Sequence, residues 1–163
     1  MPHKKPAPAD TTPAGQMIES GLRDVLGYQL AQATVVAQSV FSREVGKPHD
    51  LRPVEYTMLQ LIAENAGASP VKLAKALSVT KPNITMWVDR LVGRGLVERT
   101  PHPGDGRAQQ LRTTAKGAAL ARAATKALQQ AERNVMHSLS VGERMLLAEL
   151  LHKVACGVTQ QEP

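Results

Sequence analysis

Two short amphipathic segments lie only three residues apart in the middle of the chain, and this spacing strongly restricts the fold. Residues 70–77 and 81–94 each carry apolar side chains at three- and four-residue intervals, and the sequence SVT (78–80) separates them. Thr80 is suited to cap the second segment, and Gly95 follows it where a helix needs a left-handed C-terminal residue. Two helices joined by so short a turn predict a helix-turn-helix.

A basic hairpin is predicted directly behind these two helices. LVERT (96–100) and AQQLRT (108–113) are short extended candidates, and the loop PHPGDGR between them contains two Pro and two Gly. Between residues 81 and 112 six Lys/Arg stand against three Asp/Glu, which is half of the formal net charge of +6. Such a hairpin is a wing, whose tip can place Arg107 in a DNA minor groove, while Asp105 braces Arg107 or caps the loop.

The second helix of the pair turns a polar face away from its apolar residues. Asn can pair with adenine, Thr with a base or a phosphate, and Met can rest on a thymine methyl group. Lys and the N–H groups at a helix start suit phosphate contacts. The predicted DNA-binding residues are Lys81, Pro82, Asn83, Thr85, Met86, Arg90 and, in the wing, Arg107. A lone helix with a polar face is more often an ordinary surface helix; the basic hairpin behind this one favours DNA binding.

Amphipathic segments at both chain ends predict a helical layer outside this centre. The chain has four aromatic residues, so the core must be built from Leu, Val, Ile, Met and Ala, which suits helices. The predicted fold is mainly α with a small β-hairpin wing: a winged helix-turn-helix core plus a helical dimerisation layer from both chain ends. The predicted regions are a disordered N-terminal extension (1–16), an N-terminal dimerisation helix (17–50, helical to about residue 45), the winged helix-turn-helix (51–113) and C-terminal dimerisation helices (114–157).

Composition excludes other classes of protein. No apolar run reaches the roughly 20 residues that span a bilayer, and no hydrophobic segment follows the N-terminal lysines, so neither a membrane protein nor a secretory signal is expected. A single cysteine, Cys156, fits a reducing compartment, and a cytoplasmic protein is expected. The chain lacks the common catalytic motifs, so no enzyme activity and no catalytic residue are predicted. The five histidines are scattered, and no metal site or cofactor is expected.

With these features the chain resembles the MarR family of winged helix-turn-helix regulators. The resemblance is carried by PVEYTMLQLI, LAKALSV, VDRLVGRGLVER and DGRAQQLRTTAKG, the last with the D-x-R of the wing and the T-x-x-G of the next helix, and it covers roughly residues 22–156. It implies a homodimer that binds a pseudopalindromic operator in double-stranded DNA, mostly as a repressor. By the same resemblance the five residues from Lys81 to Met86 named above face DNA and Arg107 is the wing arginine. Met86 stands where a basic residue is frequent, which indicates an altered operator preference.

The resemblance also implies a small aromatic or phenolic effector, bound between the dimerisation layer and the winged region. Its candidate lining residues are Tyr28, Val36, Tyr56 and Met58; the alternative is that they are ordinary core residues. Cys156 is expected to be a packed or interfacial thiol rather than a redox sensor. The alternative function is a winged-helix protein-interaction module without specific DNA binding, which would need neither a basic wing nor the polar start of the second helix.

Overall fold

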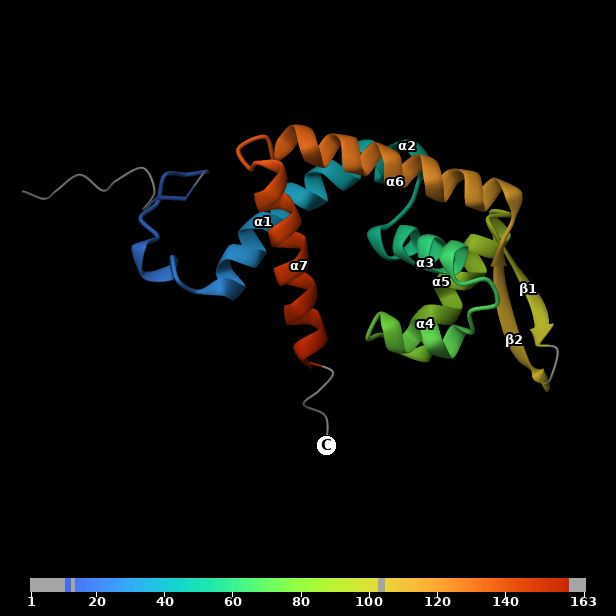
Figure 1. Cartoon of the computed structure of the whole chain (residues 1–163). Helices are drawn as coiled ribbons and strands as arrows, with labels where there is room; N and C mark the ends of the chain where they lie inside the picture. The colour runs from blue at the N-terminus through green and yellow to red at the C-terminus, as the bar shows by residue number, and fades with distance from the viewer. Residues whose placement is uncertain (1–10, 13, 103–104, 159–163) are drawn as a thin grey trace, which may run out of the picture.

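The chain folds into helices and one β-hairpin, in the order that the sequence predicts (Figure 1). The computed structural model describes residues 11, 12, 14–102 and 105–158, with side chains at all of these except 102, 105–108 and 158. The elements are η2 (Ser20–Leu22, 3₁₀), α1 (Leu26–Phe41), η3 (Ser42–Gly46, a π-helical turn), α2 (Lys47–His49), α3 (Pro53–Glu64), α4 (Pro70–Ala76), α5 (Lys81–Gly93), β1 (Val97–His102), β2 (Asp105–Thr113), α6 (Ala115–Val135) and α7 (Val141–Val158). The predicted mainly α fold with a hairpin wing is confirmed. Within the described residues no helix is long and apolar enough to cross a membrane.

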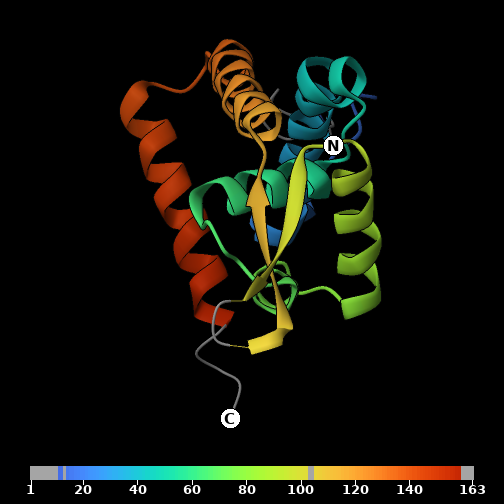
Figure 2. The same ribbon diagram turned by 90° about the vertical axis from the view of Figure 1, so that its right-hand side faces the viewer.

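The helices α3, α4 and α5 and the hairpin β1–β2 form the winged unit, which is built around α3. Met58, Leu59 and Ile62 of this helix are fully buried in the same core as the apolar face of α5 and Leu111 of β2. β1 and β2 are antiparallel, with Val97 opposite Thr113 and the register interrupted at Pro101 and His102. Figure 2 shows α3 crossing behind the hairpin, with α5 along one side and α4 below. The predicted helix-turn-helix is therefore present as α4 and α5.

The loop after α3 adds a third, short strand-like contact to the hairpin. Gly67 donates its N–H to the carbonyl of Leu111 at 3.0 Å, and Leu111 donates its own N–H to the carbonyl of Ala68 at 2.9 Å. Gly67 has φ +86°, a conformation that favours glycine. This bridge holds the start of α4 against the wing, immediately before Ser69, whose hydroxyl caps α4 by accepting the N–H of Lys72.

The T-x-x-G motif joins α6 to the winged unit. Thr114 accepts the N–H of Gly117 at 3.0 Å and donates its hydroxyl to the carbonyl of Gly95 at 2.7 Å. The N–H of Thr114 donates to the carbonyl of Leu96 at 3.1 Å. Gly95 has the predicted left-handed conformation, with φ +66°. Gly117 packs closely against Leu96: a β-carbon added to Gly117 would lie 1.9 Å from the carbonyl oxygen of Leu96.

The first predicted helix, from about residue 17 to 45, is wrong at both ends. The regular helix begins only at Leu26, because Val25 is extended and residues 20–22 form a separate 3₁₀ turn. At its other end the helical run continues past Pro48, through a wide π-type turn in which Lys47 donates to the carbonyl of Ser42, five residues earlier. It stops at Asp50, which has a left-handed conformation with φ +48°. Residues 1–10 and 13 of the predicted extension lie outside the described residues.

The terminal helices leave a large apolar surface in solvent. α1 packs against α6, and α7 runs steeply down from the end of α6 (Figure 1). A capping box starts α7: Ser140 donates its N–H to the Glu143 carboxylate at 2.7 Å, and Glu143 donates its own N–H to Ser140 Oγ at 3.3 Å. The hydroxyl and backbone of Ser140 thereby hold the pKa of the Glu143 carboxyl below its usual range. The large apolar residues exposed in and just before these helices are Leu22, Val25, Leu26, Leu30, Val35, Val36, Val141, Met145, Leu146, Leu147, Leu150, Leu151 and Val154.

Candidate nucleic-acid interface

Five of the residues predicted to contact DNA lie in the first turns of α5, at one end of the helix. Lys81, Pro82, Asn83 and Thr85 are all exposed, and Met86 is 51% exposed although it is apolar. Ile84, Val88 and Leu91 on the opposite face of the same helix are buried. Burial therefore separates the two faces of α5 as the sequence predicts. In Figure 2 this end of α5 lies beside α4, and the other end lies toward α2.

The start of α5 is not capped by a side chain. Thr80 occupies the N-cap position with an extended backbone, but its hydroxyl makes no capping hydrogen bond, so the predicted cap is wrong. Pro82 has no N–H, and the hydroxyl of Thr85 donates to the carbonyl of Lys81 at 3.1 Å rather than accepting from the first turn. In the described part of the chain Thr80 therefore leaves the first N–H groups of α5 uncapped, and the positive end of the helix dipole favours an anionic ligand there.

A hollow of about 550 Å³ lies beside this helix start. It is lined by Val71, Ala74, Lys75, Ser78, Val79, Thr80, Lys81 and Asn83. Its walls come from α4, the predicted SVT turn and the first turn of α5, and two of its lining residues are lysines. Ser78 has φ +51°, which lets the chain reverse within so short a turn. The surface at this end of the molecule is therefore a shallow hollow with apolar walls and two lysines.

The wing is fastened to α5 by an ion pair that the sequence analysis did not predict. Arg99 of β1 pairs with Asp89 of α5, one turn before the end of the helix. Arg107 and Asp105 both lie in β2, but their side chains are outside the described residues, so bracing of Arg107 by Asp105 stays a prediction. The two partners of the observed pair are ten residues apart on different elements, and no local sequence pattern links them.

Arg90 lies in a different setting from the other predicted DNA-binding residues. Its guanidinium is half-buried, with Nη2 3.0 Å from Asp50 Oδ2 and Nε 3.1 Å from Glu55 Oε1. Glu55 is the single buried charged residue in the described part of the chain, and its side chain is 0% exposed. Arg90 therefore neutralises a buried carboxylate inside the protein, whereas its neighbours at the helix start face solvent.

The four residues predicted to line an effector pocket are not brought together in the single chain. Met58 is fully buried, as expected of an ordinary core residue, and Val36 is exposed on α1. The hydroxyl of Tyr56 lies 2.8 Å from Thr125 Oγ1 of α6. Tyr28 is hydrogen-bonded through its hydroxyl to Glu19, and this bond raises the pKa of the phenol above its usual value.

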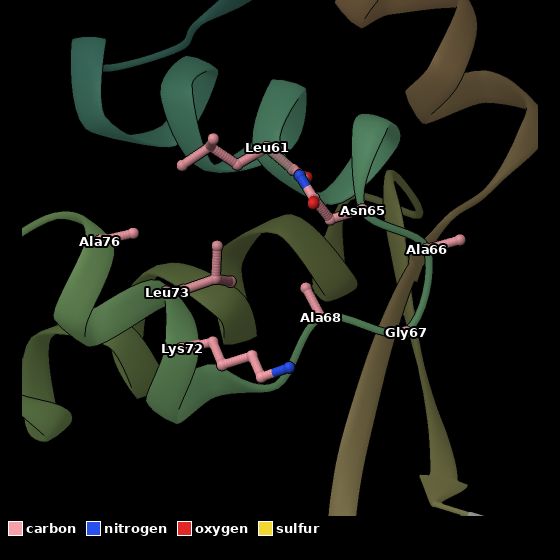
Figure 3. A pocket seen from close by; sticks show the side chains of 8 residues that line it. All are labelled: Leu61, Asn65, Ala66, Gly67, Ala68, Lys72, Leu73 and Ala76. Carbon is pink, nitrogen blue, oxygen red and sulfur yellow. The ribbon is translucent and has the colours of Figure 1, made fainter.

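A cavity of about 490 Å³ lies between α3, the loop that follows it and α4, and Figure 3 shows its lining side chains. Its lining residues are Leu61, Asn65, Ala66, Gly67, Ala68, Lys72, Leu73 and Ala76. Two further cavities lie between α6 and α7, of about 510 Å³, and between α2, the end of α5 and the start of α6, of about 520 Å³. None of these, nor the hollow beside α5, is lined by a residue of the predicted effector set.

Cys156 is exposed on α7, so the expectation of a thiol packed within the chain is wrong, and an interfacial position stays a prediction. Its Sγ lies 3.5 Å from Nε2 of His152. Over the described ranges, no three His, Cys, Asp or Glu side chains gather as metal ligands would.

A helix-turn-helix with an exposed polar recognition face, followed by a braced hairpin, defines a winged helix-turn-helix protein. The sequence model of the MarR family matches residues 51–108. A relative that is 31% identical over 147 residues is the HTH-type transcriptional repressor NicR of Pseudomonas putida, and the alignment covers 88% of this chain and 92% of NicR. The chain belongs to the MarR family of transcriptional regulators.

Solved structures of similar proteins agree with this assignment. The repressor CouR bound to a 23-mer DNA duplex superposes with a TM-score of 0.78 at 30% identity, over 86% of this chain and 99% of CouR. A mutant MarR of E. coli complexed with operator DNA superposes with a TM-score of 0.70 at 30% identity, over 80% of this chain and 94% of that protein.

Proposed function

We propose that this chain is a homodimeric transcriptional repressor that binds a pseudopalindromic operator in double-stranded DNA. Each subunit inserts the start of α5 into a major groove and places Arg107 of the wing in the flanking minor groove. The observation that carries the proposal is the exposed, uncapped and positively charged start of α5 on a helix whose other face is buried. Two similar repressors have been solved with DNA, which supports the same partner for this chain.

The decisive experiment is selection of bound sequences from a random DNA library by the purified protein at two salt concentrations. We expect an enriched pair of inverted half-sites about 10 bp apart, because recognition helices of a two-fold dimer meet successive turns of one DNA face. Affinity should fall steeply with salt, since phosphate contacts release counterions. A folded dimer that enriches no sequence would instead favour the protein-interaction module.

Asn83 is proposed to read one base pair. Its side chain is exposed in the first turn of α5, and Asn pairs with the N6 and N7 atoms of adenine. Asn83→Ala should weaken binding by about 1–3 kcal/mol and relax the preference at a single operator position. Competition binding against all four bases at each position measures this. A loss of the same size for every sequence would make Asn83 a phosphate contact.

Arg107 is proposed to enter the minor groove next to each half-site. A·T-rich flanks narrow that groove and deepen its negative potential, so Arg107→Ala should weaken binding most at operators with such flanks. The measurement compares the two proteins on one core sequence with A·T-rich or G·C-rich flanks. An equal loss on both flanks would contradict a minor-groove role.

The exposed apolar side chains of α1 and α7 are proposed to form the dimer interface. Leu150→Glu places a charge within this surface, and a buried unpaired charge is costly, so sedimentation should show monomers. Gln130→Glu adds the same charge on an exposed position of α6 and should leave the dimer intact. A dimer that survives Leu150→Glu would place the interface elsewhere.

An aromatic or phenolic effector is proposed from family membership alone, and Tyr28, Val36, Tyr56 and Met58 remain its candidate contacts. Titrating the operator complex with a panel of benzoate and phenol derivatives tests this. Release of DNA by one of them, reduced in Tyr56→Phe, would support both the effector and the site. Release unaffected by substitutions at all four positions would move the site to another cavity.

A further inference from the structure

We propose that Arg90 and Arg94 clamp the far end of the recognition helix to the turn at His49–Asp50, and that this clamp sets the spacing of the half-sites that the dimer accepts. Arg90 is then a positioning residue and not a DNA contact. The inference rests on the proposed function, because spacing has a meaning only for a dimer bound to two half-sites.

Both arginines reach the same turn from successive turns of α5. Arg94 donates from Nη1 to the carbonyl of Asp50 at 2.7 Å and from Nη2 to the carbonyl of His49 at 2.6 Å. Arg90 donates from Nη2 to the carboxylate of Asp50 at 3.0 Å and to its carbonyl at 3.3 Å. Arg94 uses two nitrogens and Arg90 one, and each makes two hydrogen bonds to this turn, which fixes both distance and angle where a single contact would not.

The turn itself is rigidly defined. Asp50 ends the α1–α2 helical run in a left-handed conformation, with φ +48°, so its carbonyl has a set direction. Glu55 in the first turn of α3 accepts the N–H of Arg52 at 2.8 Å and pairs with Nε of Arg90. The clamp is thereby anchored on both sides of the turn, in the dimerisation layer and in α3.

The clamp lies away from the DNA-facing end of α5. Arg90 and Arg94 follow Lys81 by nine and thirteen residues, which places them about 13 and 20 Å further along the helix axis. Arg94 lines the cavity between α2 and the start of α6, and Lys116 of α6 donates to the carbonyl of Arg94 at 3.1 Å. The helices α2, α3 and α6, which lie outside the helix-turn-helix, therefore meet at this end of the recognition helix.

A dimer places its two recognition helices through the contacts that hold each helix on the dimerisation layer. When the clamp is intact, the two helices have one separation, and operators with a different spacer bind poorly. When the clamp is loosened, each helix can tilt on its apolar face, and operators with a shortened or lengthened spacer become better ligands relative to the preferred one. Contacts to bases and phosphates at the start of α5 are unchanged.

The test uses the full-length protein and the operator selected by wild type. Arg94→Gln and Asp50→Asn loosen the clamp while leaving the Arg90–Glu55 pair in place. Arg122→Gln and Asp24→Asn are the matched controls, because they change the same charges at exposed positions outside this cluster. Affinities are measured for the operator and for duplexes with one base pair removed from or added to the spacer, each at several salt concentrations.

Wild type and both controls should prefer the native spacer by at least tenfold, and the two clamp variants should lose at least threefold of this preference. The salt slope should not change, whereas loss of a phosphate contact lowers it by about one unit. A lower slope with spacing preference intact would make these residues DNA contacts, and an unchanged slope and preference would make the clamp merely structural. Both results overturn the inference. If the wild-type protein selects no paired half-sites in the first place, the proposed function itself is overturned.

Discussion

Arg90→Ala is expected to lower the free energy of unfolding by about 3–5 kcal/mol, because it leaves the Glu55 carboxylate buried without its cation. Glu55 is 0% exposed, and its Oε1 has Arg90 Nε at 3.1 Å as its ionic partner. Removing one partner of a buried ion pair costs far more free energy than the intact pair contributes to stability, because the remaining charge keeps its desolvation penalty. Urea unfolding of the purified protein at fixed protein concentration measures the change.

The double variant Arg90→Met with Glu55→Met separates this penalty from other causes. Replacing both charges by apolar side chains of similar volume removes the unpaired carboxylate, so most of the lost stability should return. If the double variant is as unstable as Arg90→Ala, the loss comes from the contacts of Arg90 with Asp50 or from packing, and not from the buried charge.

Gly117→Ala is expected to destabilise the protein by about 3 kcal/mol or more, the upper end of what overpacking usually costs. The new β-carbon would lie 1.9 Å from the carbonyl oxygen of Leu96, a backbone atom that cannot rotate away. The start of α6 must therefore move off the winged unit, which breaks the hydrogen bond from Thr114 to Leu96. Operator affinity should fall together with stability, because α6 connects the helix-turn-helix to α7 and so to the proposed dimer interface.

Gly93→Ala is the matched comparison, because an added β-carbon at this helical position meets nothing within 4 Å. In a helix Ala is normally more favourable than Gly by about 0.5–1 kcal/mol, so this variant should be neutral or slightly more stable. The two substitutions are chemically identical and should differ in sign. A Gly117→Ala protein as stable as Gly93→Ala would mean that α6 and Leu96 are not in close contact.

The helix boundaries show where local sequence signals were sufficient. Pro53 and Pro70 open their helices, and Ser69, Thr114 and Ser140 cap theirs, as these residue types commonly do. Gly95 takes the left-handed conformation that the sequence predicts. The first helix was predicted poorly, because apolar residues such as Leu22 keep a helical spacing outside the helix. This helix was expected to end at about residue 45, but the helical run continues past Pro48 through a wider turn.

The sequence by itself determined the elements of this protein, the polar and apolar faces of α5 and the positive charge of the recognition region. Each of these depends on residues close together in the chain, whose spacing and capping chemistry can be read directly. Only the tertiary structure decided that Arg90 faces Asp50 and Glu55, that Arg99 binds Asp89 and that Gly117 touches Leu96. These partners are between 10 and 40 residues apart, and they meet because the packing of α3, α5 and α6 brings their helix faces and ends together.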